Sequence, residues 1–214
     1  PIVHTLEQRK YIMCDAGSGK YRLGLRTYII GASCTSQSGF EPLINIMNSV
    51  TESTQETSQF GILEGGNVLY VAKKDSPQAI RMISWVGTKL PANATAIGKA
   101  LLSDLTDEQI RDLYRDGLPK LTEHTISDMD LLLGQIEQIR CGEIATETEE
   151  STPQMRCFAV PIRQNGRVDA ALSISVPIFR YTDEKRVQIC QCLREAQQQI
   201  EQLVGLYNFE LIKP

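Results

Sequence analysis

The spacing of hydrophobic and polar positions changes its period along the chain. Across residues 40–56, apolar side chains recur at steps of three and four, which predicts an amphipathic helix. Beyond it, Gln59–Leu63 and Val68–Lys73 are short β-prone runs on either side of a Gly-Gly-Asn turn, and they predict a hairpin. Ala79–Val86 alternates loosely between apolar and polar residues, so we expect a third strand there.

The second half of the chain repeats this change of period. Thr95, Thr106, Ser127 and Thr182 each precede a helical pattern, and a hydroxyl at that position can accept from amides that have no partner within the helix. Strands are predicted at Glu143–Thr148, Met155–Arg163 and Arg167–Val176, with a tight turn at 164–166 between the last two. The order of elements predicts an α+β fold with one central antiparallel sheet and helices packed on it.

The first 35 residues form a separate pattern. Residues 1–10 are typical of the end of a helix whose start would precede the chain. Tyr11–Asp15 and Lys20–Gly24 are β-prone runs around a glycine-rich turn and predict a hairpin. A helix followed by a basic hairpin is typical of the end of a winged helix-turn-helix, and Leu25–Thr35 is predicted as a linking helix.

Charge and composition narrow the class of protein. The net charge of the chain is −4, but residues 1–30 carry +3, which leaves −7 for the remainder. This asymmetry fits a nucleic-acid-facing end, although so few charges can also differ by chance. No apolar run approaches the roughly 20 residues of a membrane span, and the polar start lacks the apolar segment of a signal peptide. We therefore expect a cytoplasmic protein that does not contact membranes.

Cysteine and histidine offer little for metal chemistry. The six cysteines show neither a C-x-x-C pair nor zinc-finger spacing, which favours reduced thiols. His4 and His124 are the only histidines, so a His-rich cluster is excluded, and a zinc site of carboxylates with one His has no support in the sequence. We expect no metal and no cofactor.

Gly87–Leu102 is the stretch with the clearest chemical potential. It leaves a strand, passes Pro91 and enters a helix near Thr95. The small residues Ala96 and Gly98 would let another molecule approach the amides at the helix start, which suit an anion such as a carboxylate. An ordinary strand-to-helix turn explains the same residues without a ligand.

Ser173 and Ser175 are separated by one residue on a predicted strand, so both side chains point to one face. Together they could donate hydrogen bonds to a small anion, or they could be surface serines of a half-exposed sheet. Cys157 is better explained as a small buried side chain than as a nucleophile, because no argument places a base such as His124 beside it. Glu147 belongs to an acidic strand end that is either solvated or able to accept from ligand hydroxyls.

Four motifs, in order, resemble the IclR family of bacterial transcription regulators. They are the hairpin end Lys20–Gly24, the run G-T-K-L-P-A-N-A-T-A-I-G-K-A-L-L at Gly87–Leu102, Glu147–Glu150 with Cys157–Pro161, and Ala170–Pro177. The resemblance covers nearly the whole chain. It implies a remnant of the winged helix-turn-helix at 1–24, a linker helix at 25–37, and a GAF-like effector-binding domain at 38–214.

The resemblance also implies a pocket and a DNA-facing end. Amides of Ala96, Ile97 and Gly98 would hold a carboxylate with Ser173 and Ser175, Cys157 would line the pocket, and Glu147 would bind a ligand hydroxyl or carbonyl through water. An apolar wall would come from Ala79, Met82 and Met155. The residues expected near DNA are His4, Arg9, Lys10 and Lys20.

The sequence thus predicts a regulator that is not an enzyme. Its effector would be a small organic acid or a sugar acid, and it would bind operator DNA through an N-terminal domain that is mostly absent from this chain. We expect a homodimer or tetramer, because palindromic operators need two recognition helices. The alternatives are an enzyme that uses Cys157 or Ser173 as nucleophile on a small carboxylate, and an interaction module whose sheet face is filled by its own side chains.

Overall fold

A computed structural model of the chain describes residues 2–37 and 40–207, with side chains for 2–31 and 40–203. The chain divides into two compact units, residues 1–43 and 44–214. None of the described helices is long and apolar enough to span a lipid bilayer.

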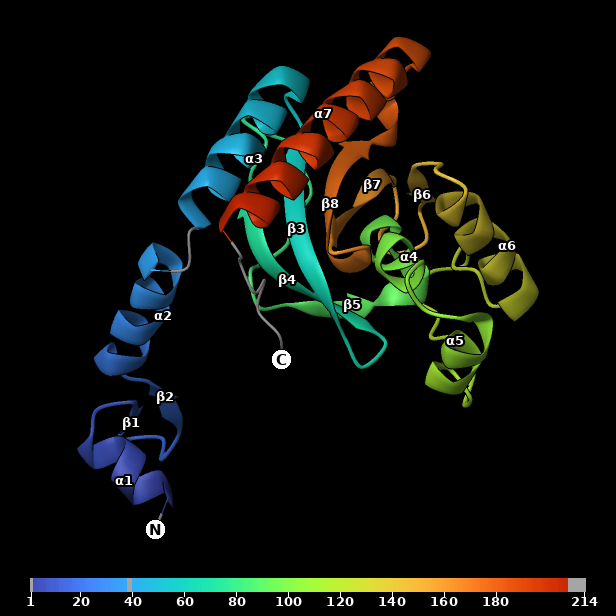
Figure 1. Ribbon diagram of the computed structural model, residues 1–214. Helices are drawn as coiled ribbons and strands as arrows, with labels where there is room; N and C mark the ends of the chain where they lie inside the picture. Colours follow the sequence, from blue (N-terminus) through green and yellow to red (C-terminus); the bar gives the residue numbers. More distant parts are fainter. Residues whose placement is uncertain (1, 38–39, 208–214) are drawn as a thin grey trace. The chain divides into compact units, whose positions relative to one another are not determined.

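The first unit contains the predicted helix end, hairpin and linking helix (Figure 1). Its elements are α1 (Ile2–Gln8), β1 (Ile12–Cys14), β2 (Tyr21–Leu23) and α2 (Leu25–Gln37). The hairpin is antiparallel, and its turn is closed by Asp15, whose carboxylate accepts from the amide and the hydroxyl of Ser18 at 2.8 and 2.7 Å. Gly24 packs so closely on the chain that a Cβ there would lie 2.2 Å from the carbonyl oxygen of Lys10, so this position requires glycine.

The second unit is built on one six-stranded antiparallel sheet (Figure 1). Its strands are β3 (Thr57–Glu64), β4 (Asn67–Lys74), β5 (Lys89–Pro91), β6 (Ala145–Thr148), β7 (Met155–Gln164) and β8 (Arg167–Pro177), in the order β5-β4-β3-β8-β7-β6. Its helices are α3 (Phe40–Thr54), α4 (Ala96–Leu102), α5 (Asp107–Leu113), α6 (Met129–Arg140) and α7 (Asp183–Tyr207). The predicted α+β class with a central antiparallel sheet is confirmed.

Helices cover both faces of this sheet. α7 packs on β7 and β8 and lies beside α3, whereas α4 packs on the opposite face against β3, β6, β7 and β8 (Figure 1). The glycines of the two predicted hairpin turns adopt left-handed backbone angles, with φ of 52° at Gly65 and 82° at Gly166. Side chains of β8 alternate between the faces, so Leu172, Ile174 and Val176 point to the α7 side.

Two sequence predictions were wrong in detail. Ala79–Val86 is not a strand, because the sheet edge beside β4 is taken by Lys89–Pro91 instead. The alternation within 81–86 nevertheless corresponds to alternating burial: Met82 and Ser84 are buried, and their neighbours are exposed. The helix predicted to follow Ser127 is capped by Asp128, whose carboxylate accepts from two amides of its first turn. The caps predicted at Thr95, Thr106 and Thr182 are all confirmed.

Candidate functional site

The strand register aligns a row of polar side chains across the α4 face of the sheet. Glu147 of β6 lies opposite Cys157 of β7, Cys157 opposite Ser175 of β8, and Ser175 opposite Thr57 of β3. Directly opposed residues of antiparallel strands point to the same face. The prediction that Ser173 and Ser175 share a face is therefore confirmed, and the polar row is the candidate site.

A chain of short contacts runs through this row. The Sγ atom of Cys157 lies 3.3 Å from Oγ of Ser175, and the Ser175 hydroxyl donates to Oε1 of Gln59 at 3.1 Å. Gln59 in turn donates through Nε2 to Oγ of Ser84 at 2.7 Å. Ser173 and Ser175 are only 2% and 1% exposed, so they are not surface serines.

Glu147 ends the row as a buried carboxylate, 2% exposed. Its oxygens accept from the amide of Glu150 at 2.8 Å and from the hydroxyl of Ser151 at 3.1 Å. Burial raises the pKa of Glu147, and hydrogen bonds from Cys157 and from the amide of Glu150 offset part of that increase. The carboxylate is thus held in place by its own loop while one side of it faces Cys157.

The electrostatics argue against Cys157 as a nucleophile. Burial raises the pKa of its thiol well above the ordinary value, and the nearby Glu147 carboxylate raises it further. His124 is half exposed and lies near the carboxylates of Glu123 and Glu149, at 3.7 and 3.9 Å, rather than near Cys157. A protonated thiol without a base lines a pocket but does not attack a substrate.

The N-terminal end of α4 packs on the sheet beside the polar row and forms one boundary of the site. Thr95 accepts from the amide of Gly98 at 3.0 Å, so this amide already has a partner and only Ala96 and Ile97 keep the predicted role as ligand donors. A Cβ at Gly98 would lie 2.2 Å from the carbonyl oxygen of Ala92, so glycine is required for the tight entry into the helix. Tyr70 also belongs to this site, because its hydroxyl hydrogen-bonds to Thr95 and interacts with Cys157 and Glu147. Burial raises the pKa of the Tyr70 hydroxyl, and the charges of Cys157 and Glu147 raise it further.

Lys99 was not singled out in the sequence, yet it is fully buried in α4. Its Nζ lies 2.5 Å from Oε1 of Glu150 and 3.5 Å from the carbonyl oxygen of Thr146. Glu150 is the neighbour whose amide Glu147 accepts, so this ion pair ties α4 to the loop that carries the pocket carboxylate. A single lysine within residues 96–102, which are otherwise apolar, was the signal in the sequence that pointed to a buried charge.

The predicted apolar wall is only partly assembled. Met82 and Met155 are buried, but Ala79 is exposed. Met82 and Ser84 line a cavity of about 530 Å³ between the 81–86 segment and the end of β4. Trp85, expected on a pocket strand, is 72% exposed and lines the same cavity.

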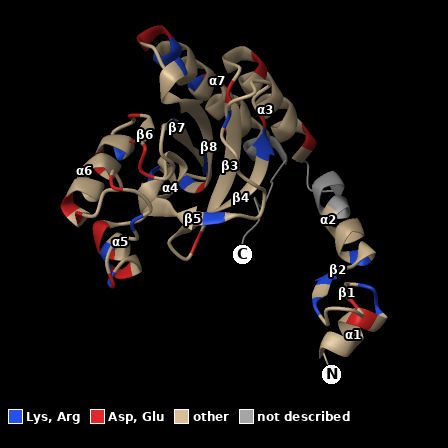
Figure 2. Cartoon of the chain, turned by 180° about the vertical axis from the view of Figure 1, so that it is seen from behind, with Lys and Arg blue, Asp and Glu red and all other residues tan. Residues whose placement is uncertain are grey.

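The residues predicted to face DNA all lie in the first unit. His4, Arg9, Lys10 and Lys20 are exposed, and the basic positions follow α1 and precede β2 (Figure 2).

Comparison with known proteins shows which family this chain belongs to. The family described as "Bacterial transcriptional regulator IclR C-terminal" matches residues 40–202, which is well over half of the chain. The chain belongs to the IclR family of bacterial transcriptional regulators. This family consists of regulators and not of enzymes, so the alternative of a small-carboxylate enzyme is wrong.

Relatives and solved structures agree with this assignment to the IclR family. The HTH-type transcriptional regulator KdgR of Dickeya chrysanthemi is 29% identical over 211 residues, which is 97% of this chain and 69% of KdgR. An IclR transcriptional regulator from Alicyclobacillus acidocaldarius has the same fold, with a TM-score of 0.87 and 22% identity over 95% of this chain and 83% of that one. An IclR homolog from Microbacterium hydrocarbonoxydans, complexed with 4-hydroxybenzoate, gives a TM-score of 0.78 at 23% identity, over 94% of this chain and 82% of that one.

Proposed function

We propose that this IclR-family chain binds a small organic acid or sugar acid on the α4 face of its sheet and thereby controls the binding of operator DNA. The observation that carries the proposal is the buried polar row of Glu147, Cys157 and Ser175, extended by Gln59. A protein rarely buries so many adjoining polar groups in a hydrophobic layer unless they hydrogen-bond to each other or to a ligand.

The groups in this row favour an acid that also carries a hydroxyl or carbonyl oxygen. A ligand carboxylate would accept from the amides of Ala96 and Ile97 and from the hydroxyls of Ser173 and Ser175. Glu147 can accept from a ligand hydroxyl. The serines lie on the same side of the sheet as α4, which supports this arrangement.

Gln59 and Ser84 suggest how a ligand would enter. The Gln59 amide hydrogen-bonds to both Ser175 and Ser84, so it occupies the place beside the serines that a ligand would take. Ser84 also lines the cavity of about 530 Å³ next to the 81–86 segment. This size lies within the range of roughly 300–1,000 Å³ for small-molecule sites. Binding would exchange the Gln59–Ser84 hydrogen bond for contacts with the acid.

The proposed response follows from differential affinity. The effector would bind one arrangement of a homodimer or tetramer better than another, and so shift the population that fits an operator. The exposed basic residues Arg9, Lys10 and Lys20, with His4, would approach phosphates of the DNA.

Replacement of Lys20 by Gln should reduce the slope of log affinity against log salt concentration by about 1, measured by titrating the protein with double-stranded DNA at several salt concentrations.

The effector test is a titration of the protein with pyruvate, glyoxylate, sugar acids and aromatic acids such as 4-hydroxybenzoate. Binding is followed by calorimetry and by the fluorescence of Trp85, the only tryptophan, which lines the entry cavity. We expect saturable binding of one class. Affinity should fall about tenfold or more in the double variant Ser173→Ala/Ser175→Ala, because each lost hydrogen bond to a charged group is worth about 1.5–3 kcal/mol.

The matched control is Ser49→Ala, the same substitution at an exposed serine of α3. It should leave the affinity unchanged. If none of the acids changes the fluorescence or the thermal midpoint, the pocket assignment is wrong. Equal affinity for the wild type and the double serine variant would place the acid elsewhere.

A further inference from the structure

A second cavity lies at the β6 edge of the sheet, between α6 and α7. Its volume is about 460 Å³, and its walls come from α6, β6, β7 and α7. The lining includes Gln135, Thr146, Arg156, Phe158, Arg186 and Cys190. Arg156 and Phe158 flank Cys157 in β7, so their side chains point away from the α4 face. The cavity is therefore separate from the site proposed above.

Arg156 packs against two aromatic rings in this cavity and has no ion-pair partner among the described residues. Its guanidinium carbon lies 4.4 Å from the ring centre of Tyr181 and 5.5 Å from that of Phe158. Its Nε atom is buried and has no hydrogen-bond partner in the described part of the chain. A guanidinium packed against two rings has lost part of its conformational freedom, so binding an anion costs it less further entropy.

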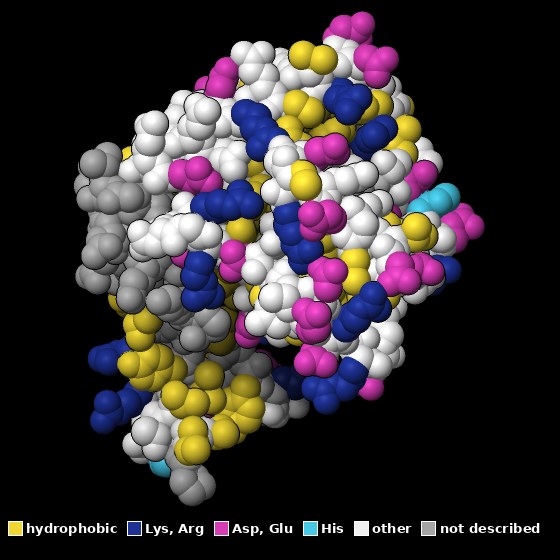
Figure 3. All heavy atoms as spheres, turned by 45° about the vertical axis from the view of Figure 1, so that its right-hand side comes forward, with side chains coloured by type: hydrophobic (Ala, Val, Ile, Leu, Met, Phe, Trp, Pro, Cys, Tyr) yellow, Lys and Arg dark blue, Asp and Glu magenta, His cyan; other side chains and the backbone are white. Residues whose placement is uncertain are grey.

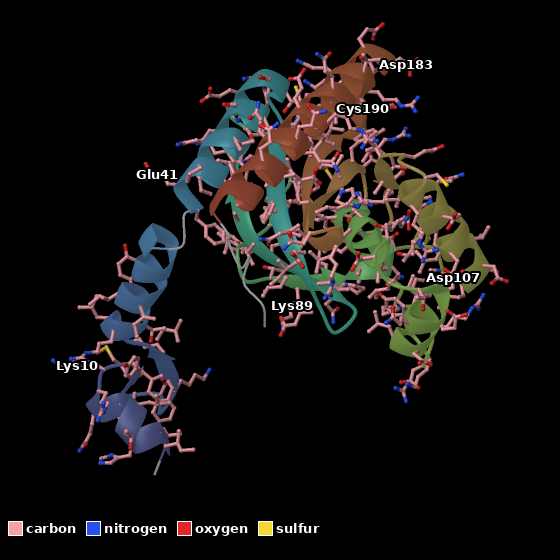
Figure 4. The ribbon with its side chains drawn as sticks, in the orientation of Figure 1. Lys10, Glu41, Lys89, Asp107, Asp183 and Cys190 are labelled. Carbon is pink, nitrogen blue, oxygen red and sulfur yellow. The ribbon has the colours of Figure 1, made fainter. Side chains whose placement is uncertain are left out.

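Arg186 brings a second positive charge to the same cavity. Among the residues that the structure describes, no carboxylate lies within 4.0 Å of Arg156 or Arg186. Other arginines of this unit differ: Arg140 pairs with Asp107 and Glu137, and Arg180 with Glu56. Arg186 precedes Cys190 by four residues on α7, which is about one helical turn. Cys190 is labelled in Figure 4.

The cavity is also lined by a side-chain amide oxygen, that of Gln135, which has no hydrogen-bond donor among the described residues. The Oε1 atom of Gln135 in α6 is buried and has no partner within residues 2–37 and 40–207. Glu143 is the only acid in the lining, against the two arginines. Figure 3 turns this side of the molecule forward and shows Lys and Arg side chains lying beside hydrophobic ones in its upper part. Within the part of the chain that the structure describes, the lining thus combines two guanidinium groups without an ion-pair partner and one amide oxygen without a donor, around a volume of metabolite size.

We propose that this cavity is a second ligand site, for a small hydroxylated molecule that carries a phosphate or carboxylate group. Arg156 and Arg186 bind the oxyanion, and Gln135 accepts from a ligand hydroxyl. The site goes beyond the proposed effector function, because it uses none of the residues of the polar row.

Cys190 supplies a local readout. Its alkylation by iodoacetamide is measured by peptide mass spectrometry on the intact protein, with Cys14 of the first unit as internal reference. The probes share one scaffold: glucose 6-phosphate carries a phosphate, gluconate a carboxylate, and glucose neither. At least one of the two anions should slow alkylation of Cys190, by about threefold at twice its dissociation constant. Glucose should have no effect.

Variants test which residues are responsible for the protection of Cys190 from alkylation. Arg186→Gln, at an exposed position, should abolish it without disturbing the fold, and Arg156→Gln should do the same if its circular dichroism is native. The control Arg115→Gln makes the same charge change at an exposed arginine outside the cavity, and it should retain full protection. Ser173→Ala/Ser175→Ala should also retain it, which separates this site from the effector pocket.

The proposal is overturned if neither anion protects Cys190, or if protection persists in both arginine variants. Loss of protection in the double serine variant would mean that the anion acts from the effector pocket, and would overturn it equally.

Discussion

Along β8, the side chains that point to the two faces of the sheet are buried to the same degree but differ in polarity. On β8, Leu172 and Ile174 are 0% exposed toward α7, and Ser173 and Ser175 are 2% and 1% exposed toward α4. The apolar face needs only shape and volume to be stable. The polar face is stable only while each hydroxyl has a partner. This difference means that the β8 side chains pointing to α7 serve stability, whereas Ser173 and Ser175 are available for recognition.

The comparison extends to charge. The α4 face buries the ion pair Lys99–Glu150 and the carboxylate Glu147. On the α7 face, Arg156 remains half-buried against aromatic rings. Buried charges are costly unless paired, so substitutions on the two faces should have different consequences. The following predictions test that difference, from the largest expected effect to the smallest.

Removal of the buried cation should have the largest effect. Lys99→Met leaves the Glu150 carboxylate buried without its partner, and should lower the free energy of unfolding by about 3–5 kcal/mol in urea titrations. Arg111→Met is the control: its pair with Asp130 is 53% and 83% exposed, and such surface pairs contribute about 0–1 kcal/mol. Equal losses in the two variants would show that burial does not set the cost.

A cavity on the apolar face should affect stability but not recognition. Leu172→Ala should lower the free energy of unfolding by about 2–5 kcal/mol, because it leaves a void between the sheet and α7. The affinity for the acid identified in the titration should stay within about twofold of the wild type, since the side chain points away from the polar row. A large loss of affinity together with native circular dichroism would contradict the separation of the faces.

Ser175→Ala should produce the reverse pattern. It leaves Oε1 of Gln59 without its donor, which should cost about 1–3 kcal/mol of unfolding free energy. Its effect on ligand affinity should exceed that of Leu172→Ala, even though its effect on stability is smaller. Calorimetric titrations of both variants measure the two quantities, and a ranking in the same order for both would reject the contrast.

The helix cap should matter least among the structural groups. Thr95→Ala removes the acceptor of the Gly98 amide and should cost about 0.5–2 kcal/mol. Thr95→Ser keeps the hydroxyl and should recover most of this loss in thermal unfolding. If the serine variant is as unstable as the alanine variant, the cap is not the source of the effect.

A pH dependence should distinguish Glu147 from exposed acids. Because the pKa of Glu147 is raised in the folded state, the folded protein binds its proton more tightly than the unfolded chain does. The favourable contribution is complete below the ordinary pKa of 4.5 and is lost as pH rises through the raised value. The stability of Glu147→Gln relative to the wild type should therefore increase from pH 4.5 upward. A flat difference across this range would show that the pKa of Glu147 is not raised.

Most of the fold was predictable because local rules determine it. The spacing of Leu172, Ser173 and Ile174 separates two faces wherever this segment forms a strand. The turn glycines Gly65 and Gly166 specify hairpins because they allow positive φ. The prediction of a strand at Ala79–Val86 was wrong because a segment can alternate between buried and exposed side chains without pairing its backbone with a neighbouring strand. Ser84 instead accepts hydrogen bonds from the side chains of Gln59 and Lys73.

The candidate site was only partly predictable. The serines and Cys157 were identified, but Gln59, Tyr70 and Ser84 were not. These residues join the site through cross-strand register and through a loop that folds back on the sheet, and neither is encoded in local spacing. Lys99 was missed because its partner Glu150 lies 51 residues away in the sequence.

The sequence by itself determined most of the elements, the parity of the serines, three of the four predicted helix caps and membership of the IclR family. All of these depend on residues close together in the chain or on motifs in a fixed order. Only the tertiary structure decided which polar groups meet, that Lys99 is paired, and that Arg156 and Arg186 share a cavity while no described carboxylate lies within 4.0 Å of either. These properties depend on distances between strands and helices far apart in the sequence, which are set when the sheet closes and water is excluded from both of its faces.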